Sequence, residues 1–379
     1  MAALVRDEKL VAHWKFRYGG LRSGQKLRPT IEIIPDDVLL IFKFYRMMDN
    51  PSFGQKTDVE EWQTQQYFSL SGIPFLGLSN RLLSATHLAT LELTNIPHSW
   101  NISPETVATL LSILSNLGTL SLGFQSPQSR PDWWSQRPPP PPERSVIPSL
   151  TSFYFKGVIC YLEELLARIH TPQLDKMHIT FFNQISFKDP QLNQFINRTP
   201  TLRACGDSEA HIQLGDSTAS VRFRHRTPTS TSSGGLLITI LCGDPDWQLS
   251  SLEQVCNSSL PPLSTVEDLH IEHRYSKLVW ENDTIENDLW LRLLLPFIAV
   301  KNLYLSEEFA PGIAAALQEL VGFRITEVLP NLRKVFVEGL EPSGRFMESI
   351  GQFAIERELS AQPVTVSDIS LEDSNLDLM

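Results

Sequence analysis

The chain has 379 residues, of which 42% are hydrophobic, so it is long enough to bury a sizeable core. Its 32 basic residues against 43 acidic residues give a formal net charge of −11 at neutral pH. This balance argues against nucleic acid as the main partner, because phosphate contacts need clustered Lys and Arg side chains.

Neither a signal peptide nor a membrane span is expected. Charges from Arg6 onward interrupt the first apolar run, and no apolar stretch reaches the roughly 18–20 residues that cross a bilayer. The cysteines, at positions 160, 205, 242 and 256, form no close pair, so we expect reduced, buried thiols. We therefore expect a cytoplasmic or nuclear protein without a membrane partner.

Two short segments precede the main part of the chain. Residues 1–30 carry seven Lys and Arg residues against two acidic residues, which predicts a basic, solvated tail. Residues 31–48 are more apolar. Pro35 and two acids open a predicted helix there, and apolar side chains follow at helical spacing (Val38, Leu39, Phe42 and Tyr45).

A leucine pattern recurs across residues 62–345. The motif L-x-x-L-x-L, with other apolar residues in some Leu positions, occurs at residues 88–93, 117–122, 150–155, 174–179, 266–271, 300–305 and 332–337. A weaker copy lies at residues 68–73. On either side of residues 205–245, the central residues of neighbouring copies are 23 (68 to 91) to 34 (269 to 303) positions apart. Several of these spacings exceed the common leucine-rich range of about 20–29, which predicts helices inserted between strands.

Each copy predicts a short strand, because its last two Leu positions lie two apart and point to the same face. One unit cannot bury its Leu row, whereas stacked units form a continuous core. Ser103 is a predicted N-cap, followed by Pro104 in the first helical turn. Further helices are predicted within residues 161–169, 190–197, 246–257, 284–295 and 311–321. The expected fold is an α/β, irregular leucine-rich-repeat solenoid. It is horseshoe-like, with parallel strands lining the concave face, helices behind them and a short helical N-terminal segment.

Two segments interrupt the pattern. Residues 125–148 contain five consecutive prolines, which favour an extended polyproline II form and cannot join a sheet. We expect a stiff surface loop there, with a ligand for an aromatic-groove domain as the alternative. Residues 205–245 predict three strands (210–214, 220–224 and 236–242), which either extend the main sheet or form a separate insert. Residues 346–379 predict a capping helix and an acidic C-terminal tail.

Several phrases of the sequence resemble one protein family. IPDDVLLIFKFY (34–45) resembles the first half of an F-box. LLSATHLATLELTNIPHSWNISPE (82–105), DWQLSSLEQVCNSSLPPL (246–263) and FAPGIAAALQELVGFRITEVLPNL (309–332) are similar, in content and order, to segments of the F-box-like, leucine-rich-repeat family of mushroom-forming fungi.

The resemblance implies a substrate-recognition subunit that links a target protein to a Skp/cullin-type ubiquitin ligase. Its contact with the Skp-type adaptor would be carried by Pro35, Val38, Leu39, Ile41 and Phe42. The second half of the F-box, with its Val-Cys-x-x-Trp type segment, is missing, because residues 46–58 are polar and rich in turn formers. The alternative is therefore a leucine-rich-repeat protein-binding scaffold without ligase coupling.

Candidate partner-binding residues follow from the strand period. Side chains between the Leu positions point away from the Leu core and line the concave face. Aromatic and charged residues on such a face are typical contacts. We expect an unidentified protein substrate to bind Tyr154, Lys156, Lys176, His178, His270, Tyr304 and Phe336. The alternative for each is an ordinary solvated strand residue.

The sequence predicts no catalytic, cofactor or metal site. The only close His pair, His270 and His273, lies three apart on a predicted strand, so its side chains point to opposite faces. Residues 54–57 end like a phosphate-binding loop but lack the earlier glycine, and no Gly-x-Ser-x-Gly motif occurs. The prediction is a non-enzymatic protein, with an enzyme built on residues 205–245 as a third hypothesis.

Overall fold

The computed structural model divides into two compact units, residues 1–58 and 59–379, which are described separately. It describes residues 4–7, 10–13, 66–71, 87–97, 102–127, 143–182, 191–204, 209–224, 234–258, 263–273, 287–320, 322–338 and 345–368. In the first unit, β1 (Leu4–Asp7) and β2 (Leu10–His13) form an antiparallel hairpin. The predicted basic tail of residues 1–30 thus contains a hairpin, and its solvation stays a prediction. The predicted helical segment of residues 31–48 lies outside the described residues.

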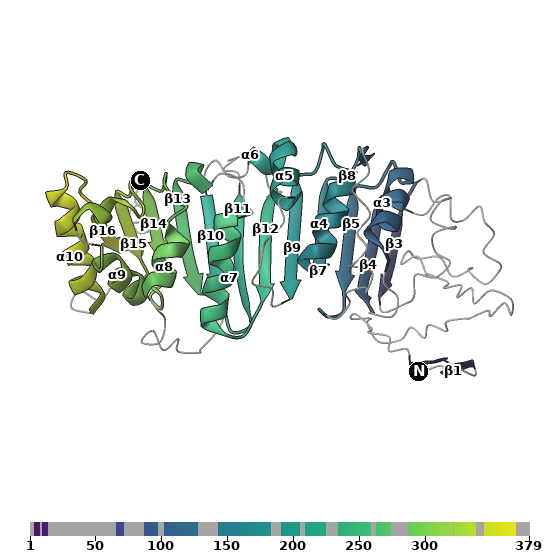
Figure 1. Cartoon of the computed structure of the whole chain (residues 1–379), viewed down its shortest axis with the longest axis horizontal. Coiled ribbons are helices and arrows are strands. Elements are labelled where there is room, and N and C mark those ends of the chain that lie inside the picture. Colours follow the sequence, from purple (N-terminus) through teal and green to yellow (C-terminus); the bar gives the residue numbers. More distant parts are fainter. Residues whose placement is uncertain are drawn as a thin grey trace, which may run out of the picture. The chain divides into compact units, whose positions relative to one another are not determined.

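The second unit is mixed α/β, and the main sheet of its described residues has twelve strands. In chain order these are β3 (Tyr67–Ser71), β4 (Thr90–Ile96), β5 (Thr119–Phe124), β7 (Ser152–Gly157), β9 (Lys176–Phe182), β10 (Glu209–Leu214), β11 (Thr218–Arg224), β12 (Gly235–Leu241), β13 (Asp268–His273), β14 (Asn302–Leu305), β15 (Lys334–Val337) and β16 (Thr365–Asp368). Across the sheet the order is β16-β15-β14-β13-β10-β11-β12-β9-β7-β5-β4-β3 (Figure 1). Only β11 among them runs antiparallel to its neighbours. The sheet is open, with β3 and β16 at its edges.

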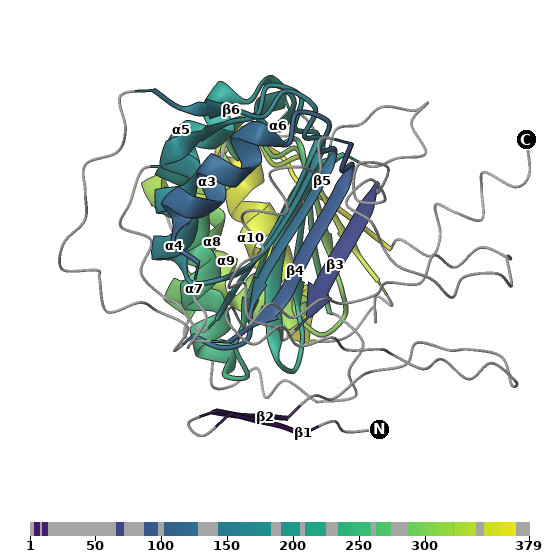
Figure 2. The same ribbon diagram turned by 90° about the vertical axis from the view of Figure 1, so that its right-hand side faces the viewer.

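Helices follow the strands along the chain and cover one face of this sheet (Figure 2). They are α3 (Pro104–Ile113), α4 (Ile159–Arg168), α5 (Gln191–Arg198), α6 (Pro200–Ala204), α7 (Pro245–Ser258), α8 (Asn287–Leu294), α9 (Ala310–Gln318) and α10 (Arg345–Leu359). The Leu positions of the strands face them: Tyr161 in α4 stacks on Phe155 in β7, with ring centroids 6.1 Å apart. Both rings are buried, so the core lies between sheet and helices. No described helix is long and apolar enough to cross a membrane.

Charged side chains join the helices to one another and to the turns between them. Glu163 in α4 is only 2% exposed, and its carboxylate accepts the backbone N–H groups of the first two residues of α5. Arg198 in α5 donates in return to two backbone carbonyls at the end of α4 and just beyond it. Arg357 in α10 is fully buried and donates to four carbonyls between residues 325 and 332. Each charge therefore satisfies backbone groups that a helix or turn leaves open.

Residues 205–245 extend the main sheet, so the separate insert is the wrong alternative. β10 pairs with β13, β11 lies between β10 and β12, and β12 pairs with β9. The chain thus leaves β9 through α5 and α6, enters the sheet three strands away, and returns strand by strand. This meander places β10 and β13 side by side in parallel register.

The ends of the predicted elements differ in places. The Ser103 hydroxyl accepts the N–H of Thr106 at 3.1 Å, which confirms the predicted N-cap of α3. Within the predicted loop of residues 125–148, β6 (Ser145–Val146) pairs with β8 (Ile169–His170). The final helix is followed by β16, which pairs with β15, although its sequence TVSD has no row of apolar residues. The five prolines and residues 369–379 lie outside the described residues.

Candidate functional site

The face of the sheet opposite the helices is here called the open face (Figure 2). It is formed by the side chains that alternate with the buried Leu positions. In-register pairing aligns these side chains in rows across the strands. One row, here called the middle row, contains Tyr154 of β7, His178 of β9, Leu237 of β12, Arg222 of β11, His211 of β10, His270 of β13, Tyr304 of β14 and Phe336 of β15.

Four rings of the middle row form a continuous ring stack across β10, β13, β14 and β15. The ring centroids of His211 and His270 are 4.4 Å apart, and those of His270 and Tyr304 are 4.1 Å apart. Tyr304 and Phe336 follow at 4.7 Å, and all three pairs are within 12° of parallel. The spacing follows from the sheet, because strands about 4.8 Å apart hold equivalent side chains at that separation.

The far end of the ring stack is covered. Phe336 is only 4% exposed, so its prediction as an exposed contact residue is wrong. The Lys334 ammonium lies 5.6 Å from the centroid of this ring, a cation–π arrangement. Tyr304, His270 and His211 are partly exposed, so they are the members of the stack that a partner can reach.

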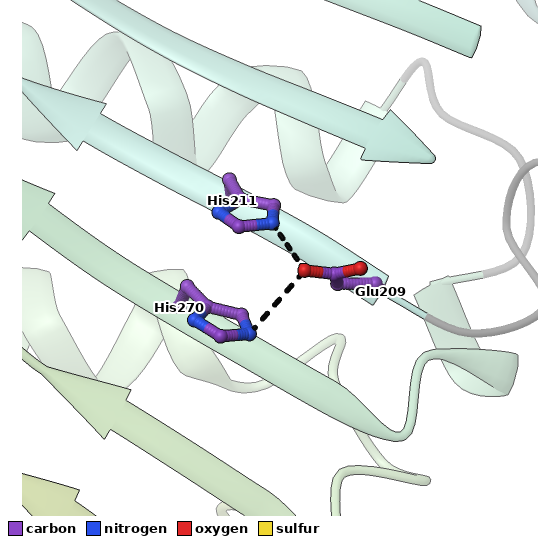
Figure 3. Close-up of side chains that lie close together, drawn as sticks. All are labelled: Glu209, His211 and His270. Carbon is purple, nitrogen blue, oxygen red and sulfur yellow. Dashed lines mark hydrogen bonds and ion pairs between the residues drawn. The ribbon is translucent and has the colours of Figure 1, made fainter. Parts of the chain in front are cut away.

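Two carboxylates, Glu209 and Glu272, bracket the histidine end of the ring stack. Figure 3 shows Glu209 with the two imidazoles. Glu209 Oε1 lies 2.5 Å from His211 Nε2 and 3.5 Å from His270 Nε2. On the other side of the rings, Glu272 Oε1 lies 3.2 Å from His211 Nδ1 and 3.9 Å from His270 Nδ1. The Gln213 amide donates to the second oxygen of Glu272 at 3.1 Å. Each imidazole thus has one nitrogen toward Glu209 and the other toward Glu272.

The two histidines of this cluster favour different protonation states. Burial disfavours a charge on His211, but its hydrogen bonds to Glu272 and Glu209 outweigh burial and raise its pKa. Burial and the neighbouring His211 lower the pKa of His270. The hydrogen bond from His211 lowers the pKa of Glu272 to about 2. The cluster therefore favours a charged His211 beside a neutral His270, with Glu272 ionised.

A second group of side chains occupies β7 and β9. The rings of Tyr154 and His178 meet edge to face, with centroids 4.9 Å apart. The Lys156 ammonium lies 5.4 Å from the ring centroid of Phe182. Burial, together with the positive charges of Arg222 and Lys176, lowers the pKa of His178.

The open face is therefore divided by charge. Its basic half consists of Tyr154, Lys156, Lys176, His178 and Arg222 on β7, β9 and β11. Its acidic half consists of Glu209, His211, Asp268, His270 and Glu272 on β10 and β13. Complementary potentials of this kind steer association and fix the orientation of a partner.

The structure brings most of the predicted contact residues together on one face. Tyr154, Lys156, Lys176 and His178 fall in the basic half, and His270 and Tyr304 belong to the ring stack. The predicted opposite orientation of His270 and His273 is confirmed. The ring centroids of His273 and Phe309 are 5.7 Å apart, so the His273 ring lies on the helix side of the sheet. The predicted adaptor residues (Pro35, Val38, Leu39, Ile41 and Phe42) lie outside the described residues.

Sequence reasoning missed the residues that complete the acidic half. His211 alternates with apolar residues in the predicted strand of residues 210–214, whereas Glu209 lies just before that strand and was not assigned to a face. Their ligand atoms and that of His270 lie within 4.8 Å of one another, a grouping that the strand patterns did not predict. The pairing of β10 with β13, which creates it, leaves no mark in either strand sequence.

Comparison with known proteins adds no function to this geometry. No family model matches the chain, and no curated protein shows significant similarity to it. The resemblance to F-box-like proteins stays a prediction.

Proposed function

We propose that the chain is a leucine-rich-repeat protein of the solenoid type that binds a protein partner on the open face of its sheet. The repeat assignment is supported by the seven copies of the leucine pattern, each of which coincides with a strand of the sheet (β4, β5, β7, β9, β13, β14 and β15). Their pattern positions also pair in register, as in Leu91 with Leu120 and Leu269 with Leu303. Stacked units of this kind leave a row of non-Leu side chains available for contact.

The single observation that carries partner binding is the open face itself. Tyr154 is 36% exposed, Tyr304 is partly exposed, and charges of both signs flank them. Accessible aromatic side chains surrounded by polar groups are the usual centres of binding energy in protein interfaces. A partner of matching chemistry would present an acidic segment to the basic half and a basic segment to the acidic half.

This proposal is tested by comparing variants of the two faces. The chain carrying Tyr154→Ala and Tyr304→Ala should lose binding of a partner first captured by the wild type and then reconstituted from purified components. The matched control is Trp247→Ala, which removes an aromatic side chain of α7 that is 50% exposed, away from the open face. Equal loss in the control, or full binding by the double variant, would contradict the proposal.

We further infer, from residues 34–45, that the chain links its partner to a Skp/cullin-type ubiquitin ligase in the cytoplasm or nucleus. The support is the sequence motif with Pro35, Val38, Leu39, Ile41 and Phe42 ahead of the leucine pattern. In this role the chain binds and presents a target but performs no chemistry itself. The alternative is a protein-binding scaffold without ligase coupling, favoured by the missing second half of the F-box.

Copurification with the adaptor separates these two roles. The wild type should recover the Skp-type adaptor, and Leu39→Asp combined with Phe42→Asp should abolish that recovery. Trp247→Ala is the control and should recover the adaptor as the wild type does. Partner binding without adaptor recovery would support the scaffold role and reject ligase coupling.

A further inference from the structure

The cluster in the acidic half has a feature that an ordinary group of ion pairs lacks. Its two imidazoles are stacked within 12° of parallel and point the same way (Figure 3). Both Nε2 atoms approach one oxygen of Glu209, and both Nδ1 atoms approach one oxygen of Glu272. Three potential ligand atoms thus converge on one side of the rings, and a carboxylate supports the rings from the other side.

We propose that Glu209, His211 and His270 form a binding site for a divalent transition-metal ion of the zinc class. Two imidazole nitrogens and one carboxylate oxygen are a donor set that zinc favours. Three protein ligands leave the fourth position of a tetrahedral ion for water. This assignment does not depend on the partner-binding proposal, because all three ligands belong to one chain.

The positions of the ligand atoms fit such an ion. Bonds of about 2.0–2.1 Å to a tetrahedral zinc place its ligand atoms roughly 3.3 Å apart. Glu209 Oε1 lies 2.5 Å and 3.5 Å from the two Nε2 atoms, which brackets that separation. The two Nε2 atoms lie within 4.8 Å of each other, and their lone pairs run nearly parallel because the rings are stacked. Both rings must therefore turn toward one point to share an ion with Glu209.

The sheet explains why the three residues meet. His211 and His270 are direct partners in the parallel pairing of β10 with β13. Glu209 precedes His211 by two residues and so lies on the same face. Strands with neighbours on both sides hold these backbone positions firmly, so only the side chains need to adjust.

Glu272 supplies the support that metal-binding histidines usually have. A carboxylate that accepts the N–H at Nδ1 orients the ring and leaves Nε2 for the metal. Glu272 does this for His211, whose Nδ1 lies 3.2 Å from its Oε1, while Nδ1 of His270 is 3.9 Å away. Gln213 in turn donates to the other oxygen of Glu272 at 3.1 Å.

The charges around the cluster also suit a cation. The carboxylates of Glu209 and Glu272 act on both rings, and that of Asp268 acts on His270. Arg222 and Arg224 of β11 pair in register with His211 and Glu209, and their positive charges oppose the cation. The three carboxylates outnumber these two charges. A bound ion would displace the proton on Nε2 of His211 to solvent. The proton on Nδ1 of His211 would stay there and remain hydrogen-bonded to Glu272.

Metal titration of the purified full chain tests the proposal. After treatment with a chelator, the wild type should bind one zinc ion per chain in calorimetry. Cobalt in place of zinc should give visible absorption bands of a tetrahedral site. His211→Asn, His270→Asn and Glu209→Gln should each weaken zinc binding by more than about 100-fold, beyond the 10–100-fold of a supporting residue. His178→Asn, which removes a ring of the basic half, is the matched control and should bind zinc like the wild type.

Histidine-selective NMR of the wild type keeps the test independent of whether the variants fold. Of the nine histidines in the chain, zinc should shift the imidazole signals of His211 and His270. No saturable zinc binding by the wild type overturns the proposal. So does undiminished binding by both His variants of the cluster, which would place the ion elsewhere in the chain. Because no partner protein is present, either result leaves partner binding to be judged separately.

Discussion

The two halves of the open face each hold a histidine in the same row of the same sheet, but the pKa values of these two histidines are shifted in opposite directions. In the basic half, burial and two nearby cations lower the pKa of His178. In the acidic half, two carboxylates raise the pKa of His211 in spite of burial. The comparison shows that a residue's place in the strand decides which face it occupies, whereas the charges around it, from its own strand and from neighbouring strands, decide its chemistry.

The side of the sheet that faces the helices does not differ between the two halves, because the side chains at its leucine-pattern positions are apolar and buried in both. Ile179 of β9 and Ile271 of β13 occupy equivalent pattern positions and are both fully buried. We expect Ile179→Ala and Ile271→Ala each to lower the free energy of unfolding by about 3 kcal/mol, because each leaves a cavity in the core. Urea unfolding of the two variants measures this. A large cost in one half alone would mean that the halves do not share a core.

The next largest expected effect is on zinc affinity, which should depend on the acidic half and not on the basic half. Glu272→Gln removes the carboxylate behind both imidazoles and should weaken zinc binding by about 10–100-fold. Lys176→Gln changes a charged residue of the basic half and should leave the affinity unchanged. Calorimetry on both variants checks the difference, and equal affinities would show that Glu272 does not support the site.

A smaller effect, also arising in the acidic half, is the loss of folding stability at low pH. The pKa of Glu272 falls from 4.5 to about 2 on folding, so its contribution is present above pH 4.5 and is lost as pH falls toward about 2. Its side chain is 41% exposed, so solvent screening limits the contribution to less than about 1 kcal/mol. We expect Glu272→Gln to flatten this part of the pH profile of stability, as followed by urea unfolding. An unchanged acid limb in the variant would contradict this assignment.

The smallest expected effect concerns how the free energy of unfolding changes with pH near neutrality. His211 and His178 should contribute to this change with opposite signs. The raised pKa of His211 stabilises the fold below its ordinary value of 6.5, and this stabilisation is lost as pH rises through the folded pKa. The lowered pKa of His178 does the reverse, so stability is lost as pH falls below 6.5.

His211→Asn and His178→Asn should therefore change the slope of stability with pH in opposite directions. Unfolding midpoints measured from about pH 5.5 to about pH 8 are the readout, since histidine is the side chain that titrates there. The groups that face these rings, Glu209 and Glu272 in one half and Arg222 and Lys176 in the other, stay in place in both variants. Slopes that change in the same direction would rule out the contrast between the halves.

Much of this molecule follows from local sequence. Leucines two apart predicted the strands and their buried face, as at Leu269 and Ile271, and Ser103 before Pro104 predicted the start of α3. Most of the predicted contact residues share the open face for the same reason. The failures are also local in origin: TVSD gave no alternation to mark β16, and nothing beside Phe336 indicated that its ring is covered.

The sequence by itself determined which side chains point away from the core, because that depends only on a period of two along each strand. Only the tertiary structure placed Glu209 and His211 beside His270. His211 and Glu272 are 61 residues apart, and their contact depends on a meander that inserts β10 next to β13. Strand pairing at this distance is decided by how the whole sheet packs. The charge environment that distinguishes the two halves could therefore not be predicted from either strand alone.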